Sequence, residues 1–168
     1  MSYQESKGIT LLEMIIVCGV ASVLLAITGI AWQKASANRH MDAVVAELEA
    51  GLALARQTAQ NHNGAYITFV LPNGSSDGSW TLFPGSYDDS TKQNMTAQKS
   101  ISRVLNVSFS PSTTNVIQFN SAGSIDQTIS PLNSNGNCEI IISLGGDNRQ
   151  TTLTIVGMTG AVVKNVTN

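Results

Sequence analysis

Glu13 is the first candidate for a chemical role in this 168-residue chain, because it is a charged residue within a long apolar segment. It lies near the start of an apolar run, residues 9–32, in which it is the only charged side chain. About 20 apolar residues cross a bilayer as a helix, so the run is long enough to span a membrane. A carboxylate inside a bilayer costs roughly 2.5–3.5 kcal/mol, so such residues are usually paired or functional. Because the run contains no basic residue, we expect Glu13 to pair with a cation from another chain.

Two other interpretations of this run remain open on the residues alone. Ala35-Ser36-Ala37 has the form of a signal peptidase site, and cleavage there would release a secreted domain that begins at Asn38. The run is longer than the roughly 7–15 apolar residues of a signal peptide core, however, and this interpretation gives Glu13 no role. The run could also be a plain membrane anchor whose glutamate reaches the membrane interface.

The stretch GITLLE, at residues 8–13, resembles the processing signal of type IV prepilins and type II secretion pseudopilins. In that family, prepilin peptidase cuts after the glycine and methylates the new N-terminus. The resemblance therefore implies a leader of residues 1–8, cleavage between Gly8 and Ile9, and methylation of Ile9. It also implies that Glu13 pairs with the N-terminal amine of a neighbouring subunit during filament assembly. One departure is that the first mature residue is usually phenylalanine, whereas this chain has isoleucine.

Residues 33–60 continue the helical pattern in amphipathic form. Apolar residues recur at every third or fourth position, as they do along one stripe of a helix. No proline interrupts residues 9–60, and Asn61, Asn63 and Gly64 provide a stop. We predict one continuous helix over 9–60, with a transmembrane half (9–32) and an amphipathic half (33–60) that packs on a distal domain. The predicted stripe consists of Met41, Val45, Leu48, Leu52, Ala55 and Ala59.

Residues 61–168 have the composition and patterning of a β-rich globular domain. Short β-branched and aromatic segments alternate with turns rich in Gly, Asn and Ser, without intervening helices. The chain is therefore predicted to be an α+β protein, in which a long N-terminal helix packs on an antiparallel β-sheet or small β-sandwich. The first two strands are expected to form a hairpin, residues 84–100 an exposed loop, and residues 145–148 a turn. The expected strands cover residues 65–71, 80–83, 102–109, 115–119, 124–129, 138–144, 151–156 and 161–166.

Three segments of this second part narrow the resemblance. Residues 116–123, VIQFNSAG, resemble the Phe-x-x-x-Gly signature of minor pilins and pseudopilins of the GspH/FimT type. Residues 77–80, DGSW, are similar to a tryptophan hairpin of the FimT/FimU branch, and the helix end at residues 54–59 also fits. Judged by residue type alone, Phe119 is a core aromatic and Gly123 a turn glycine, so both support a fold and not a site.

DNA binding by this subunit alone is disfavoured. Some members of the branch bind DNA through arginines in a C-terminal Gly-Arg-x-Arg motif. The matching stretch here, residues 160–163, is GAVV and lacks both arginines, and only Arg149 and Lys164 lie in this terminal region. The net charge of the chain is −2. DNA affinity depends on the number of phosphates that are neutralised, so one or two cations are too few.

The chain shows no catalytic motif and no metal-ligand spacing, so we expect neither an enzyme nor a cofactor or metal site. His40 and His62 lack a nucleophile or ligand nearby in the sequence. Asp88-Asp89 could hold a calcium ion but fit a solvated acidic loop better. The two cysteines are expected on opposite sides of the membrane interface, too far apart for a disulfide: Cys18 lies in the apolar run, and Cys138 is expected to be a buried strand residue.

These observations together predict a minor pilin-like structural subunit. It would be anchored in the bacterial inner membrane by a single pass, with its globular domain in the periplasm, and cut by prepilin peptidase. It would then assemble with other minor and major pilins, taking part in initiation of a type IV pilus at or near its tip. One alternative is a minor pseudopilin of type II secretion, and another is a DNA- or surface-binding module of the pilus tip.

Overall fold

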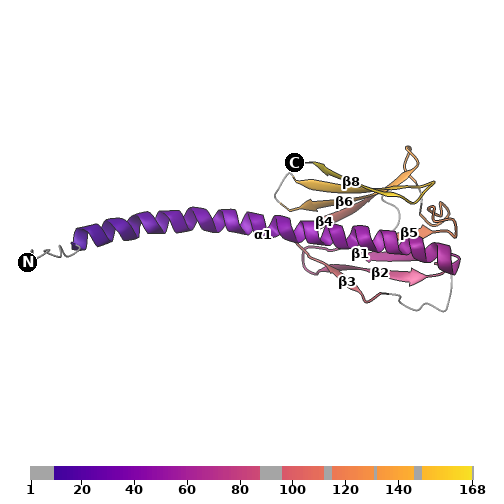
Figure 1. The fold of residues 1–168 in the computed structure, drawn as a ribbon, viewed down its shortest axis with the longest axis horizontal. Coiled ribbons are helices and arrows are strands. Elements are labelled where there is room, and N and C mark those ends of the chain that lie inside the picture. Colours follow the sequence, from indigo (N-terminus) through magenta and orange to yellow (C-terminus); the bar gives the residue numbers. More distant parts are fainter. Residues whose placement is uncertain (1–9, 88–95, 112–114, 131, 146–148, 168) are drawn as a thin grey trace, which may run out of the picture. The chain divides into compact units, whose positions relative to one another are not determined.

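The computed structural model describes residues 10–87, 96–111, 115–130, 132–145 and 149–167 (Figure 1). The chain divides into two compact units, Met1–Arg39 and His40–Asn168, which are called the first and second unit below. One helix, α1, covers Leu11–His62. The strands are β1 (Ala65–Val70), β2 (Gly78–Pro84), β3 (Lys99–Ile101), β4 (Leu105–Ser110), β5 (Val116–Phe119), β6 (Asn137–Leu144), β7 (Gln150–Val156) and β8 (Val162–Thr167).

The helix ends where the sequence predicts a stop. Asn63 adopts a left-handed conformation with φ 59°, which asparagine tolerates better than most residues. The N–H of Gly64 then donates to the carbonyl of Ala59 at 2.9 Å, the hydrogen bond of a Schellman cap. The cap satisfies a carbonyl that would otherwise be orphaned at the end of the helix.

The described part of the first unit is a helix whose apolar side chains are exposed. This segment is long and apolar enough to cross a membrane. Ser22 and Thr28 interrupt the apolar surface, but their hydroxyls donate to the carbonyls of Cys18 and Leu24, each at 2.7 Å. Such bonds within the helix leave fewer polar groups to be satisfied by lipid. The large exposed apolar residues include Leu11, Leu12, Met14, Ile15, Ile16, Val17, Val20, Val23, Leu24, Leu25, Ile27 and Trp32.

The second unit contains two four-stranded antiparallel sheets and the C-terminal half of α1 (Figure 1). Sheet A has the order β3-β2-β1-β5, and sheet B has the order β4-β6-β7-β8. The predicted hairpin of the first two strands is confirmed, since β1 pairs with β2 and places Phe69 opposite Trp80. The α+β prediction is confirmed as well, with the sheet resolved into two four-stranded layers.

All six residues of the predicted helical stripe are buried in the core of the second unit. They pack with Ile67 and Leu82 of sheet A and with Ile140 and Leu153 of sheet B. Residues on the other helix faces, such as Ala46 and Ala50, are exposed. The helix therefore joins the two sheets into one core, because each sheet has one apolar face to cover.

The predicted strand over 124–129 is wrong. Ile125 forms only an isolated bridge to Phe119, and the residues after it form a turn. The carboxylate of Asp126 accepts the N–H of Thr128 at 3.0 Å, and the carbonyl of Asp126 accepts the N–H of Ser130 at 2.9 Å. An aspartate that binds backbone groups just after it favours a turn over an extended strand, although the flanking residues alternate as in a strand.

The boundary between the predicted loop 84–100 and the predicted strand 102–109 is also wrong. Residues 99–101 form β3, which pairs with the start of β2, and the next strand begins only at Leu105. The intervening turn is held by the N–H of Arg103, which donates to Asp77 Oδ1 at 2.8 Å, and by the N–H of Leu105, which donates to the Ser102 carbonyl. The contact between Arg103 and Asp77 forms only after folding, because the pairing of β2 with β3 brings Asp77, just before β2, to this turn.

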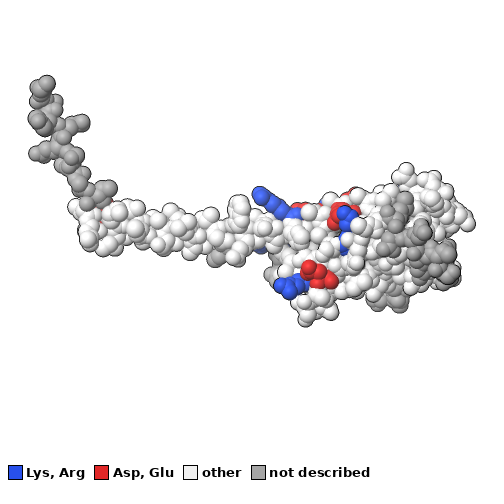
Figure 2. Space-filling view, turned by 90° about the horizontal axis from the view of Figure 1, so that it is seen from below, with Lys and Arg blue, Asp and Glu red and all other residues white. Residues whose placement is uncertain are grey.

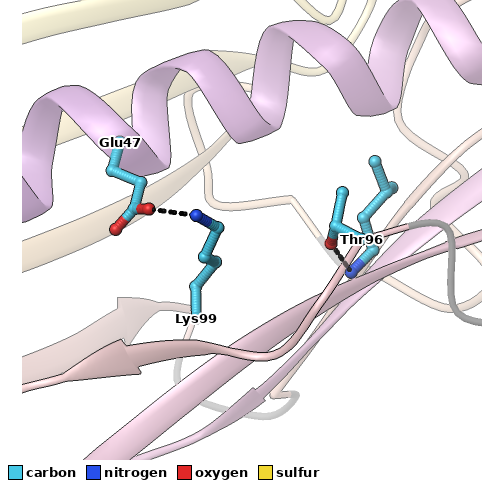
Figure 3. A network of polar contacts seen from close by, with 4 residues as sticks. Glu47, Thr96 and Lys99 are labelled. Carbon is cyan, nitrogen blue, oxygen red and sulfur yellow. Dashed lines mark hydrogen bonds and ion pairs between the residues drawn. The ribbon is translucent and has the colours of Figure 1, made fainter.

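Two polar contacts attach this region to its neighbours (Figure 3). Lys99 Nζ lies 2.8 Å from Glu47 Oε1 on α1, and Thr96 Oγ1 accepts the N–H of Leu82 at 3.3 Å. Both ion-pair partners are about two-fifths exposed, and exposed pairs of this kind contribute about 0.2–1 kcal/mol. The pair thus orients β3 against the helix more than it stabilises the fold.

Candidate functional site

Glu13 lies in the first turn of α1. Thr10 precedes the helix, and its Oγ1 accepts the N–H of Glu13 at 3.2 Å. The Thr10 carbonyl accepts the N–H of Met14, also at 3.2 Å. Thr10 is therefore the N-cap and Glu13 the third helical residue, the spacing of a capping box. The sequence TLLE thus determines both where the helix begins and where the carboxylate lies on it.

The helix itself stabilises the Glu13 carboxylate only in part. A negative charge in the first turn of a helix is stabilised by about 0.3–1 kcal/mol, and by up to about 2 kcal/mol when partly buried. This is less than the roughly 2.5–3.5 kcal/mol that a carboxylate costs inside a bilayer. In the part of the chain that the structure describes, neither the ion pair Lys99–Glu47 nor the ion pair Arg149–Asp42 involves Glu13. The helix dipole therefore offsets only part of the cost that a carboxylate carries inside a bilayer.

The other predicted site residues, Gly8 and Ile9, lie outside the described residues. Cleavage between them and methylation of Ile9 stay predictions. Asp88 and Asp89, considered above for calcium, also lie outside the described part of the chain.

The signature residues Phe119 and Gly123 serve the fold. Phe119 is fully buried. Gly123 has φ 78° and lies in a turn that contacts the C-terminal end of α1. A Cβ at Gly123 would lie 2.8 Å from Gln60 Nε2 and 3.2 Å from Arg56 Cγ. Gly160, at φ 63°, is packed against the carbonyl of Gly123 so closely that a Cβ would overlap it. The two turns therefore interlock through a pair of glycines.

The tryptophan of the DGSW segment has a similar structural role. Trp80 is buried, and the edge of its ring lies against the backbone of Gly51, where a Cβ would collide with the ring. Sequence reasoning missed Gly51. The available signal was a glycine inside an amphipathic helix on the face of Leu48 and Leu52, a position that costs helix stability unless close packing requires it.

The residues that could bind a metal ion or a nucleic acid do not form a cluster in the described part of the chain. No group of three metal-ligating side chains and no pocket is found among the described residues. The guanidinium of Arg149 is engaged with Asp42 Oδ1 at 2.7 Å, and Lys164 is exposed on β8. Figure 2 shows blue and red side chains lying next to one another on the second unit, without a broad basic patch on that face. This arrangement does not favour binding to nucleic-acid phosphates.

Cys138 behaves as a core residue. It is buried on β6, as predicted, and both Cys138 and Cys18 are free thiols. Burial, with a smaller contribution from the neighbouring Glu139 carboxylate, raises the pKa of Cys138 to about 11. Because the thiolate is the reactive form, this side chain is inert near neutral pH.

Solved structures with a similar fold include a type IV minor pilin and a minor pseudopilin of a type 2 secretion system. The chain is similar to the type IV minor pilin FimU of Pseudomonas aeruginosa, with 13% identity, a TM-score of 0.58, and coverage of 76% of this chain and 90% of FimU. A second crystal form of FimU gives 15% identity and a TM-score of 0.56 over 74% of this chain and 91% of FimU. The minor pseudopilin EpsH from the type 2 secretion system of Vibrio cholerae gives 13% identity and a TM-score of 0.52 over 75% of this chain and 96% of EpsH. At these identities the likeness shows the fold alone.

The sequence comparison identifies the family. A search of curated proteins found no match. The family model described as type II transport protein GspH matches residues 44–159, which include most of the buried part of α1, all of sheet A, and β4, β6 and β7 of sheet B. This match confirms the resemblance to minor pilins and pseudopilins of the GspH/FimT type. The chain therefore belongs to the GspH family.

Proposed function

We propose that this protein is a minor pilin-like structural subunit that helps to initiate a type IV pilus, at or near its tip. The observation that carries the proposal is the N-terminal turn of α1. There a capping threonine holds Glu13 at the third helical position of an exposed apolar helix. A carboxylate in that environment needs a cation, and the processed N-terminal amine of a neighbouring subunit in a filament can supply it.

The cation in this proposal is the methylated N-terminal amine of a neighbouring subunit. Prepilin peptidase creates such an amine in each subunit, in this chain at Ile9 by cutting after Gly8. An ion pair with Glu13 would offset the part of the membrane cost that the helix dipole leaves, and it would set the register between adjacent helices. The pair is intermolecular, so it favours incorporation into a filament over an isolated subunit in the membrane.

The apolar surface of the first unit supports the same proposal. Over residues 11–29 its side chains are exposed on every side of the helix. Such a helix is stable either in lipid or packed among other helices. We propose that it anchors the subunit in the bacterial inner membrane, with the second unit in the periplasm, and then packs against other minor and major pilins in the filament.

The decisive measurement is the N-terminus and intact mass of the protein from cells with and without prepilin peptidase. We expect a mature chain that begins at methylated Ile9 and that appears only when the peptidase is present. A Gly8→Ala variant, measured in parallel, tests the same bond from the substrate side and should retain the leader. A chain that begins at Asn38 in both strains would overturn the proposal, and so would an intact leader in both.

The second candidate is a minor pseudopilin of a type II secretion system. It is favoured by the family description, type II transport protein GspH, and by the shared fold with EpsH. N-terminal processing and the role of Glu13 are the same in both candidates. Deletion of the gene separates them, because loss of surface pili with normal secretion supports the pilus. Loss of secretion with normal pili supports the pseudopilus.

A further inference from the structure

The four sheet edges of the second unit are protected to different degrees. Sheet A ends in β3, which is only three residues long, and in β5. The outer side of β5 is occupied by a turn: the N–H of Gln118 donates to Ser130 Oγ at 2.8 Å, and the Gln118 carbonyl accepts the N–H of Asp126, also at 2.8 Å. A short edge and a covered edge both resist pairing with another chain.

Sheet B ends in β4 and β8, and the side chains of these two edge strands differ in how deeply they are buried. On β4, the inward residues Leu105 and Phe109 are buried. β8 is six residues long, and all of its residues from Val163 onward are exposed. Because β8 is the last strand of sheet B, its outer side presents a row of backbone N–H and C=O groups that an extended segment could pair with.

Lys164 lies at the centre of this edge on the side of the sheet that faces the core. Directly opposite residues in an antiparallel pair point to the same face. Lys164 is opposite Leu153, and Leu153 is opposite Ile140, both fully buried. A row of apolar side chains that begins at Phe109 on β4 thus ends in a lysine on β8.

The neighbours of Lys164 on the same face of β8 are apolar. Val162, opposite Ile155, packs partly against the core, and Val166, opposite Thr151, is 42% exposed. Without the lysine, this face of β8 would be a continuous apolar strip beside an open hydrogen-bonding edge. None of the ion pairs in the described part of the chain involves Lys164, so its charge faces solvent.

We propose that Lys164 prevents the β8 edge from pairing with the β8 edge of a second copy of this chain. Pairing two such edges would extend the sheet across both copies and cover its inward face. The two ammonium groups would then be drawn toward an apolar surface and toward each other. Burying an unpaired charge is costly, and inward-pointing charges are a known protection of edge strands. This inference is independent of the proposed function, because it concerns only the second unit and needs no filament.

The test compares the oligomeric state of the full chain in detergent micelles, measured by light scattering and sedimentation over a range of concentrations. In the Lys164→Val variant we expect dimers at concentrations at least about tenfold lower than in the wild type. Lys164→Arg keeps the charge and should behave as wild type. Asn165→Val adds the same side chain one residue later, on the outer face opposite the half-buried Thr152, and is the matched control.

Backbone exchange identifies the surface that pairs. In Lys164→Val dimers, hydrogen exchange of the β8 amides should slow, while that of β3 should not change. Lys164→Thr provides a second neutral variant, in case the valine variant folds poorly. The proposal is overturned if both neutral variants associate no more than the wild type, if Asn165→Val associates equally, or if the dimers leave β8 exchange unchanged.

Discussion

The two parts of α1 meet the need for burial in different ways. In the second unit one stripe of the helix is buried against both sheets, and the faces away from it are exposed. In the first unit apolar side chains lie around the whole circumference of the helix over residues 11–29, and all of these residues are exposed. Figure 2 shows the contrast, since the helix of the first unit is covered by uncharged side chains along most of its described length. The half of α1 in the second unit packs against the two sheets of the same chain. The apolar half in the first unit has to be covered by lipid or by other helices.

This comparison predicts that changes in the first unit affect assembly and changes in the second unit affect stability. The largest effect on assembly is expected from Glu13→Ala, which should reduce incorporation into filaments by tenfold or more. The loss of a charge-assisted ion pair worth more than about 1.4 kcal/mol corresponds to that factor. The measurement is the amount of variant in sheared filaments relative to the amount in membranes.

Glu13→Asp is the control that keeps the charge, and it should retain part of the incorporation. Melting of the second unit should be unchanged in both variants. Normal incorporation of Glu13→Ala would show that the carboxylate has no pairing role, and the first unit would then act only as an anchor.

Leu52→Ala tests the other half of the helix. Leu52 is fully buried between the sheets, and truncation of a buried leucine costs about 2–5 kcal/mol. Leu54→Ala, two residues later at a position 38% exposed, is the matched control and should cost less than about 1 kcal/mol. Denaturant unfolding of the full chain in detergent measures both. Equal effects of the two substitutions would contradict a single buried stripe.

The buried thiol predicts a pH dependence confined to the second unit. The folded state raises the pKa of Cys138 from an ordinary value of 9.0 to about 11, so the folded protein holds this proton more tightly than the unfolded chain. The associated stability is complete below about pH 9 and is lost as the pH rises toward 11, by roughly 2 kcal/mol. The measurement is the unfolding free energy between pH 8 and pH 11 for the wild type and for Cys138→Ala. The difference between the two pH dependences is the contribution of Cys138. Identical slopes in the two proteins would contradict it.

Gly51→Ala tests how closely the helix approaches the hairpin. Alanine improves helix propensity by about 1 kcal/mol, but its Cβ would collide with the Trp80 ring, and overpacking of this kind costs about 1–3 kcal/mol. We expect a net loss of about 1 kcal/mol, measured by denaturant unfolding. In a Trp80→Phe background the smaller ring should make the same substitution neutral or favourable. If the two substitutions prove additive, the contact does not limit this position.

The most local effect is expected from Thr10→Ala. Loss of the N-cap should destabilise the first turn of α1 by about 1 kcal/mol, while Thr10→Ser should leave it intact. Hydrogen exchange of the amides of Glu13 and Met14 in micelles reports this local change. A faster exchange in Thr10→Ala with unchanged incorporation would separate the start of the helix from the pairing of Glu13.

Much of the first unit and of α1 could be predicted from the sequence because the signals are local. The apolar run, the stripe that begins at Met41 and the stop at Asn63 depend on residues within one or two helical turns. The strand boundaries were less predictable. Residues 124–129 alternate like a strand, yet Asp126 turns the chain, and β3 forms only because β2 is there to pair with it.

The sequence alone determined that this chain has a membrane-compatible helix with one carboxylate, an amphipathic continuation, and a β-rich distal part. Those features follow from hydrophobic periodicity and capping, which act between near neighbours. Only the tertiary structure decided that β1 pairs with β5, that β4 pairs with β6, and that the strands divide into two sheets. It also decided the contact of Trp80 with Gly51 and the inward position of Lys164 on β8. These features depend on which distant strands and turns lie beside one another, a choice made by packing the whole core and not by any local stretch.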